Sequence, residues 1–249
     1  MHQKKANKQP ATIVTAADSN AAFPFELSNR INTNKITSWQ TNGELKYSMR
    51  IPNFFGIEDL KVAIVQNITT DEDYGLPVRN TNLSFYNADS LLFTFDEEFL
   101  HDEKISVLQD PMQMADINGD GLLDIKLIFR HWGSGRLNLF TRVYYLFQTP
   151  DHTFDAFYVQ YLMLNGSNDA EYDIDCDGNF EIVTMSYDLD CLIFRTFNYL
   201  DGKIVNVDEK FDYPLVSGID FNGSEIQNIK PVQEVDVKEL KPVEFIKMN

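Results

Sequence analysis

The chain has 249 residues, of which 43% are hydrophobic and 13% aromatic, enough for one large packed domain or two small ones. Its 38 acidic and 21 basic residues give a net charge of −17, which argues against nucleic acid as a partner because phosphate recognition needs a basic patch. Long stretches of apolar period 3.6 are hard to find, and no run of about 18 apolar residues occurs. We therefore expect an all-β protein without membrane insertion.

Residues 1–25 are expected to form a flexible N-terminal segment. They begin with polar and basic residues, continue with small ones through Ala22, and lack the apolar stretch that a signal peptide needs. The chain is therefore either intracellular or numbered from a point after a removed targeting segment.

Two features precede the first complete motif. The segment Asn53-Phe-Phe-Gly56-Ile-Glu-Asp59 predicts a turn, because glycine permits a sharp reversal of the chain. The acidic runs at 71–73 and 96–98 could supply the carboxylate pair of a glycosidase. In a chain with 38 acidic residues, a solvated surface is the more common role of such runs.

Residues 116–125 carry a calcium-loop pattern. Oxygen side chains stand at loop positions 1, 3 and 5, a glycine at position 6 and a carboxylate at position 9. Ca²⁺ takes roughly 6–8 oxygen ligands, and the glycine permits the turn that brings them together. With the residue at position 7, the expected ligands are Asp116, Asn118, Asp120, Leu122 and Asp124.

The next turn is a candidate partner-binding site. His131, Trp132 and Arg136 lie on or beside a glycine-rich turn, and aromatic and arginine side chains are enriched in binding hot spots. The alternative is an ordinary hairpin turn with a tryptophan packed at the end of a strand.

A second calcium loop follows in the same register. Its expected ligands are Asp173, Asp175, Asp177, Asn179 and Glu181. One such segment could be an ordinary turn rich in Asp and Gly, but two in the same register favour two Ca²⁺ sites.

Both loops differ from the EF-hand. An EF-hand has a bidentate Glu at position 12 and continues as a helix, whereas position 12 here is Leu127 or Thr184. The residues after each loop are β-branched and aromatic and partly alternate in polarity, which predicts a strand. Dockerin loops are excluded for the same reason, because they also lead into a helix.

The similarity extends beyond the loops. The segments beginning at Arg142 and Arg195 match, and so do those beginning at Phe154 and Val207. A weaker copy at Gly56 is expected to have lost the metal and kept the turn, and a shortened remnant lies at Gly223. A repeat of about 60 residues indicates a repeat architecture.

This pattern resembles the FG-GAP/VCBS family of calcium-dependent β-propeller repeats, which includes the integrin α-subunit propeller. The likeness covers residues 50–225. It implies that residues 26–227 form a small β-propeller-like domain of about four or five blades, with calcium loops between strands. A looser resemblance is to small bacterial propellers that act as periplasmic lysozyme inhibitors.

The two cysteines are expected to be free thiols. Cys176 lies in the second loop, and Cys191 should lie at the far end of the hairpin that follows it. At about 3.3 Å per residue, this separation exceeds the roughly 7 Å between Cα atoms that a disulfide tolerates.

Residues 228–249 are expected to form an edge strand or a tail that binds a partner. Because calcium loops suit compartments rich in Ca²⁺, we expect an extracytoplasmic location, periplasmic, secreted or surface-anchored, after removal of a targeting segment.

Three functions are open from the sequence. The first is a non-catalytic, calcium-stabilised module that binds a protein or glycan, in its most specific form an inhibitor of a cell-wall hydrolase. The second is a propeller enzyme that hydrolyses polysaccharides or esters. The third is a scaffold subunit of a larger assembly.

Overall fold

The computed structural model describes residues 34–36, 40–41, 46–70, 77–100, 112–130, 140–162, 170–188, 191–222, 225–231 and 243–249. Within these residues the protein is all-β, as expected, with three antiparallel sheets and one helix of four residues, α1 (Asp208–Phe211). No helix in these ranges is long and apolar enough to cross a membrane.

The first sheet, called the N-terminal sheet, is a meander in which each strand pairs with the next along the chain. Long runs of β-branched and aromatic residues, separated by tight turns, favour such hairpins. The strands are β2 (Gln40–Thr41), β3 (Lys46–Phe54), β4 (Ile57–Thr70), β5 (Pro77–Asn87) and β6 (Ser90–Leu100).

The central sheet has the order β1-β7-β8-β9-β10-β17. Each of its edges is a short strand that is distant in sequence from the strand with which it pairs. Its strands are β1 (Asn34–Ile36), β7 (Met112–Ala115), β8 (Asp124–Arg130), β9 (Phe140–Gln148), β10 (Phe154–Leu162) and β17 (Ile246–Lys247).

The C-terminal sheet has the order β11-β12-β13-β15-β16, with β14 also paired to β13. Strand β13 changes partner along its length, from β15 at residues 191–194 to β14 at 197–200. Its strands are β11 (Glu171–Tyr172), β12 (Glu181–Asp188), β13 (Cys191–Leu200), β14 (Lys203–Asn206), β15 (Leu215–Asn222) and β16 (Glu225–Pro231).

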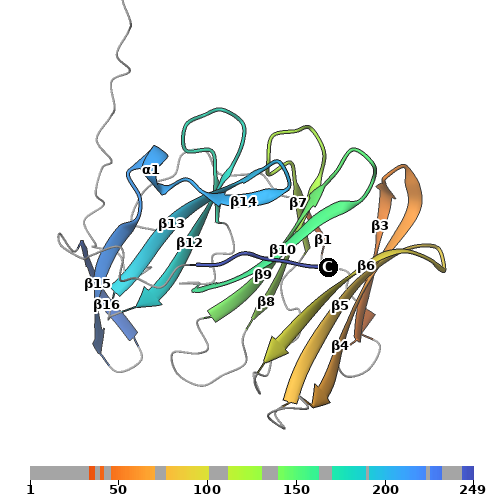
Figure 1. The fold of residues 1–249 in the computed structure, drawn as a ribbon, viewed down its shortest axis with the longest axis horizontal. Coiled ribbons are helices and arrows are strands. Elements are labelled where there is room, and N and C mark those ends of the chain that lie inside the picture. The colour runs from red at the N-terminus through yellow and green to blue at the C-terminus, as the bar shows by residue number, and fades with distance from the viewer. Residues whose placement is uncertain are drawn as a thin grey trace, which may run out of the picture.

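The three sheets pack face to face, with the central sheet in the middle (Figure 1). Alternate residues of a strand point to opposite faces. Ile125 and Leu127 of β8 therefore lie in the core shared with the N-terminal sheet, whereas Ile128 lies in the core shared with the C-terminal sheet. The central sheet is thus buried on both faces.

The N-terminal sheet has one apolar face, toward the central sheet, and one polar face. On the polar face the hydroxyls of Ser84 and Thr94 lie 2.8 Å apart, and the Lys61 ammonium lies 5.4 Å from the centre of the Tyr86 ring. An alternation of this kind is typical of an antiparallel sheet with one solvated side.

Each sheet contains the same succession of four paired strands: β3 to β6, β7 to β10, and β11 to β14. The predicted calcium loops connect the first strand to the second in the last two of these units. In the first unit this place is taken by the turn Phe55–Gly56, with φ of 55° and 69°. The expected turn at Gly56 is therefore confirmed.

Two of the sequence matches were out of register. Arg142 lies opposite Phe129 in β8, but Arg195 lies opposite Thr184, two residues nearer the loop in its own repeat. The match at residues 207–211 falls on α1, and the counterpart of β10 is β14. This second mismatch arises because the turn before β14 holds only Asp201 and Gly202 and is shorter than the turn between β9 and β10.

The C-terminal residues 243–249 run across the stack (the dark blue strand in Figure 1). Strand β17 pairs with β10. The half-buried Phe245 packs against the core between the central and C-terminal sheets, and Met248 packs in the core on the other side of the central sheet. This segment was expected as an edge strand or a tail, and strand β16 spans the domain boundary expected at residue 227.

Candidate metal centre

The two predicted calcium loops have the same hydrogen-bond network. In the first loop, the Asp116 carboxylate accepts from the backbone N–H of Asp120 at 3.1 Å and of Gly121 at 2.9 Å. In the second, the Asp173 carboxylate accepts from Asp177 N–H at 2.9 Å and Gly178 N–H at 3.1 Å. Position 1 therefore closes both loops in the same way.

The carboxylates at position 5 also make the same contact in both loops. One carboxylate oxygen of Asp120 accepts from the N–H of Leu122 at 2.8 Å, and one of Asp177 accepts from the N–H of Asn179 at 2.9 Å. Both contacts turn the chain toward the strand that follows. The prediction that the two segments are copies of one loop is confirmed in its geometry.

The carboxylates at position 9, Asp124 and Glu181, are fully buried. One oxygen of each accepts from the N–H at loop position 2, Ile117 or Ile174, at 2.8 Å. The other oxygen of Asp124 accepts from Gln148 N–H at 2.9 Å. Each carboxylate thus ties the start of its loop to the sheet, a role that the sequence pattern did not reveal.

Burial perturbs the acidity of both groups, because the charged form loses hydration. It raises the pKa of Asp124 to about 7, and it also raises the pKa of Glu181 above its usual range. In the second repeat, Asn198 Nδ2 donates to the remaining oxygen of Glu181 at 3.0 Å.

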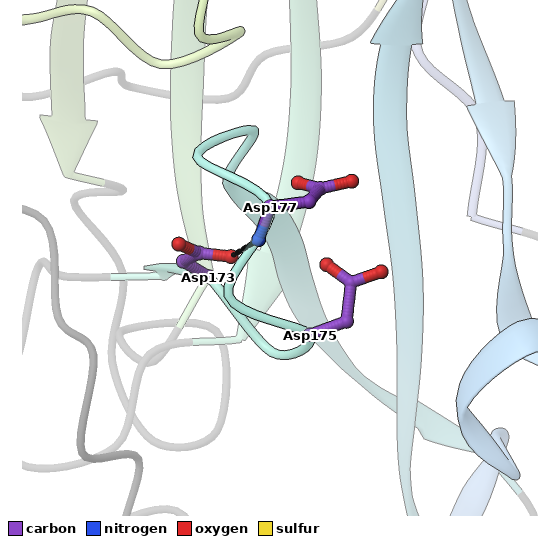
Figure 2. Close-up of side chains that lie close together, drawn as sticks. All are labelled: Asp173, Asp175 and Asp177. Carbon is purple, nitrogen blue, oxygen red and sulfur yellow. Dashed lines mark hydrogen bonds between the residues drawn. The ribbon is translucent and has the colours of Figure 1, made fainter. Parts of the chain in front are cut away.

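In the second loop, the carboxylates at positions 1, 3 and 5 converge. Asp173, Asp175 and Asp177 each offer an oxygen, and these oxygens lie within 4.8 Å of one another. Figure 2 shows the three side chains on the single turn between β11 and β12. In the first loop position 3 is an amide, and Asn118 Nδ2 donates to Asp120 at 2.9 Å.

A lysine side chain lies against the second loop. Lys210 of α1 places its ammonium 2.7 Å from Asp175 and 3.8 Å from Asp177. The hydrogen bond to Asp175 raises the pKa of Lys210. The ammonium is held there because α1 is anchored by Asp208, which accepts from Arg195 at 3.0 Å and from Thr196 N–H at 2.7 Å.

The sequence also led to predictions for the two cysteines and for a partner-binding turn. Cys176 and Cys191 form no disulfide, as expected, and Cys191 pairs with Asp188 at the end of the hairpin away from the loop. The predicted partner-binding residues His131, Trp132 and Arg136 lie outside the described residues, as does Gly223.

Comparisons of this chain with protein-family models, with curated proteins and with solved structures gave no match.

Proposed function

We propose that this protein is a calcium-stabilised module of blade-like β-repeats that binds a protein or glycan partner and performs no chemistry of its own. The observation that carries the proposal is the agreement of the two loops, hydrogen bond by hydrogen bond, with oxygen side chains at positions 1, 3 and 5 of each. The side chains that would hold the ions are Asp116, Asn118 and Asp120 in one loop and Asp173, Asp175 and Asp177 in the other, with the position-7 carbonyls of Leu122 and Asn179.

The role assigned to the ion is to stiffen the loops. The converging carboxylates of the second loop repel one another, and a bound divalent cation would turn this repulsion into attraction. The position-9 carboxylates would support the loops from beneath, because their oxygens already accept hydrogen bonds from the backbone. Their role as direct ligands remains a prediction.

The same proposal holds that the three units are repeats of the FG-GAP/VCBS type. Three sheets with the same succession of strands, packed face to face, support blade-like units. The position of both acidic loops between the first and second strands of a unit supports a common repeat. A ring of four or five blades and an extracytoplasmic location remain predictions.

Calcium is expected to raise the melting temperature. At a free concentration 100 times the dissociation constant, each site contributes about 2.7 kcal/mol, and for a chain of this size each kcal/mol is worth about 2–4 °C. Isothermal calorimetry should record two binding events, of which Asp116→Ala removes one and Asp173→Ala the other. An absence of binding at millimolar Ca²⁺ would overturn the proposal.

The two events are expected to differ in their response to Lys210. Replacing Lys210 by glutamine should strengthen, by about 1.4–5-fold, only the event that Asp173→Ala removes, because an exposed ion pair of this kind is worth about 0.2–1 kcal/mol. Calorimetry at low and high salt measures this change, which should shrink as salt screens the ammonium.

Lys203→Gln is the matched control, because Lys203 is an exposed lysine on the neighbouring strand β14. It removes the same charge and should leave both events unchanged. An equal gain from both variants would mean that net charge alone acts, and that the contact of Lys210 with Asp175 has no part in it.

Binding of a partner can be tested with immobilised peptidoglycan, soluble glycans and a cell-wall hydrolase as probes, each in calcium and in chelator. Retention that is lost in chelator supports a calcium-stabilised binding module. Release of cleaved glycan would instead favour the hydrolytic alternative.

A further inference from the structure

We propose that the two acidic loops form one coupled unit, in which an ion bound by the first loop raises the affinity of the second. The inference rests on the calcium binding proposed above and adds to it a regulation that two isolated loops would not have. It is carried by contacts between the loops, which belong to successive sheets.

The first contact is a backbone hydrogen bond. The N–H of Phe180, at position 8 of the second loop, donates to the carbonyl of Ile117 in the first loop at 2.9 Å. The N–H of Ile117 in turn donates to Asp124. The backbone of Ile117 is therefore held on both sides, by the second loop at its carbonyl and by the carboxylate beneath the first loop at its N–H.

The second contact is steric. Gly119, at position 4 of the first loop, faces the backbone of the second loop so closely that a Cβ would lie 2.6 Å from the carbonyl oxygen of Gly178. Real Cβ atoms essentially never approach this closely, and the obstacle is backbone rather than a movable side chain. The loops can only lie this way if position 4 of the first loop is glycine.

The second loop is an internal control for this conclusion. Its position 4 is Cys176, with φ of 63°, close to the 73° of Gly119. The left-handed conformation of position 4 is therefore compatible with a side chain. The first loop therefore needs a glycine at position 4 because the neighbouring loop lies so close, and not because of the conformation of its own backbone.

We expect the coupling to be positive, because the backbones of the two loops are in contact. An ion that orders the first loop holds the Ile117 carbonyl and the Gly119 surface in place, so the second loop has less disorder to lose when it binds. A coupling of this kind is typically worth about 5-fold or more in affinity, and it must be reciprocal.

The test is a pair of calorimetric titrations with Ca²⁺. In Asp116→Ala the second loop should bind about 5-fold or more weakly than in the unaltered protein, and in Asp173→Ala the first loop should weaken by the same factor. Gly119→Ala should bring this factor close to 1. Gly56→Ala should preserve it, since Gly56 lies outside both loops and also has a positive φ, of 69°, but a Cβ added there would meet no other atom within 4 Å.

A readout without metal completes the test. In chelator, the amide hydrogen of Phe180 should exchange faster with solvent in Gly119→Ala than in Gly56→Ala, because only the first substitution pushes the loops apart. Two events of unchanged affinity in the Asp variants, with equal exchange in the Gly variants, would refute the coupling and leave calcium binding intact. No binding in the unaltered protein would refute both.

Discussion

Replacing Lys126 by methionine is expected to lower the free energy of unfolding by about 3–5 kcal/mol, because the change leaves a buried carboxylate without its cation. The Lys126 ammonium lies 2.8 Å and 2.9 Å from the two carboxylate oxygens of Glu171, and both side chains are 1% exposed. The hydroxyl of Tyr145 donates to the same carboxylate at 2.6 Å.

The position of this ion pair explains the size of the effect. Lys126 belongs to β8 of the central sheet and Glu171 to β11 of the C-terminal sheet, so the pair joins two sheets at a place that water does not reach. Water cannot replace the lost partner there without opening the interface between the sheets.

Chemical denaturation of Lys126→Met measures the loss of stability. Two further variants test whether this loss comes from the unpaired carboxylate. Lys61→Met makes the same substitution at a half-buried lysine over Tyr86 and should cost about 1 kcal/mol or less. Lys126→Met combined with Glu171→Leu should recover much of the stability, because no buried charge is left unpaired. A loss below about 1 kcal/mol in the single variant would contradict the expectation.

Replacing Phe245 and Met248 together by alanine is expected to cost about 4–6 kcal/mol, a large part of the stability of a typical domain. The Phe245 ring lies 4.9 Å from that of Phe197 and 6.2 Å from that of Tyr145, between the central and C-terminal sheets. Met248 is 4% exposed in the core of the N-terminal and central sheets.

The backbone of the same segment holds it in place between these two cores. The N–H of Met248 donates to Ala156 of β10 at 2.8 Å, and the carbonyl of Asn249 accepts from Asp96 of β6 at 3.1 Å. Lys247 pairs with Asp155 at 2.6 Å. Because one short segment touches all three sheets, its loss should also weaken the cooperativity of unfolding.

Thermal and denaturant unfolding of the double variant should show a lower midpoint and a broader transition. Ile246→Ala is the matched control, because Ile246 is 46% exposed and its truncation should change stability by about 0.5 kcal/mol or less. An equal loss in the control and in the double variant would show that the side chains of Phe245 and Met248 do not anchor the segment.

Several features of the fold could be predicted because they depend on neighbouring residues. Glycine turns, alternation of polarity and β-branched runs act within a few residues, and they identified the two loops, the strands behind them and the turn at Gly56. The repeat of these signals also predicted the common succession of strands.

The predictions failed where the outcome depends on residues far apart in the sequence. Arg142 and Arg195 were matched by identity, but strand register is set by the length of each turn and by the face that each sheet buries. The backbone hydrogen bonds of the position-9 carboxylates could not be predicted either, because one of their donors, Gln148, belongs to another strand; their role as ligands stays a prediction.

The sequence by itself determined that this is an all-β chain of repeated strands with two acidic loops of one design, because turn chemistry and polarity patterns are local. Only the tertiary structure decided that the loops touch at Gly119, that Lys126 meets Glu171 and that residues 243–249 cross all three sheets. These contacts arise from the packing of one sheet on another, and packing depends on shapes and distances that no local pattern encodes.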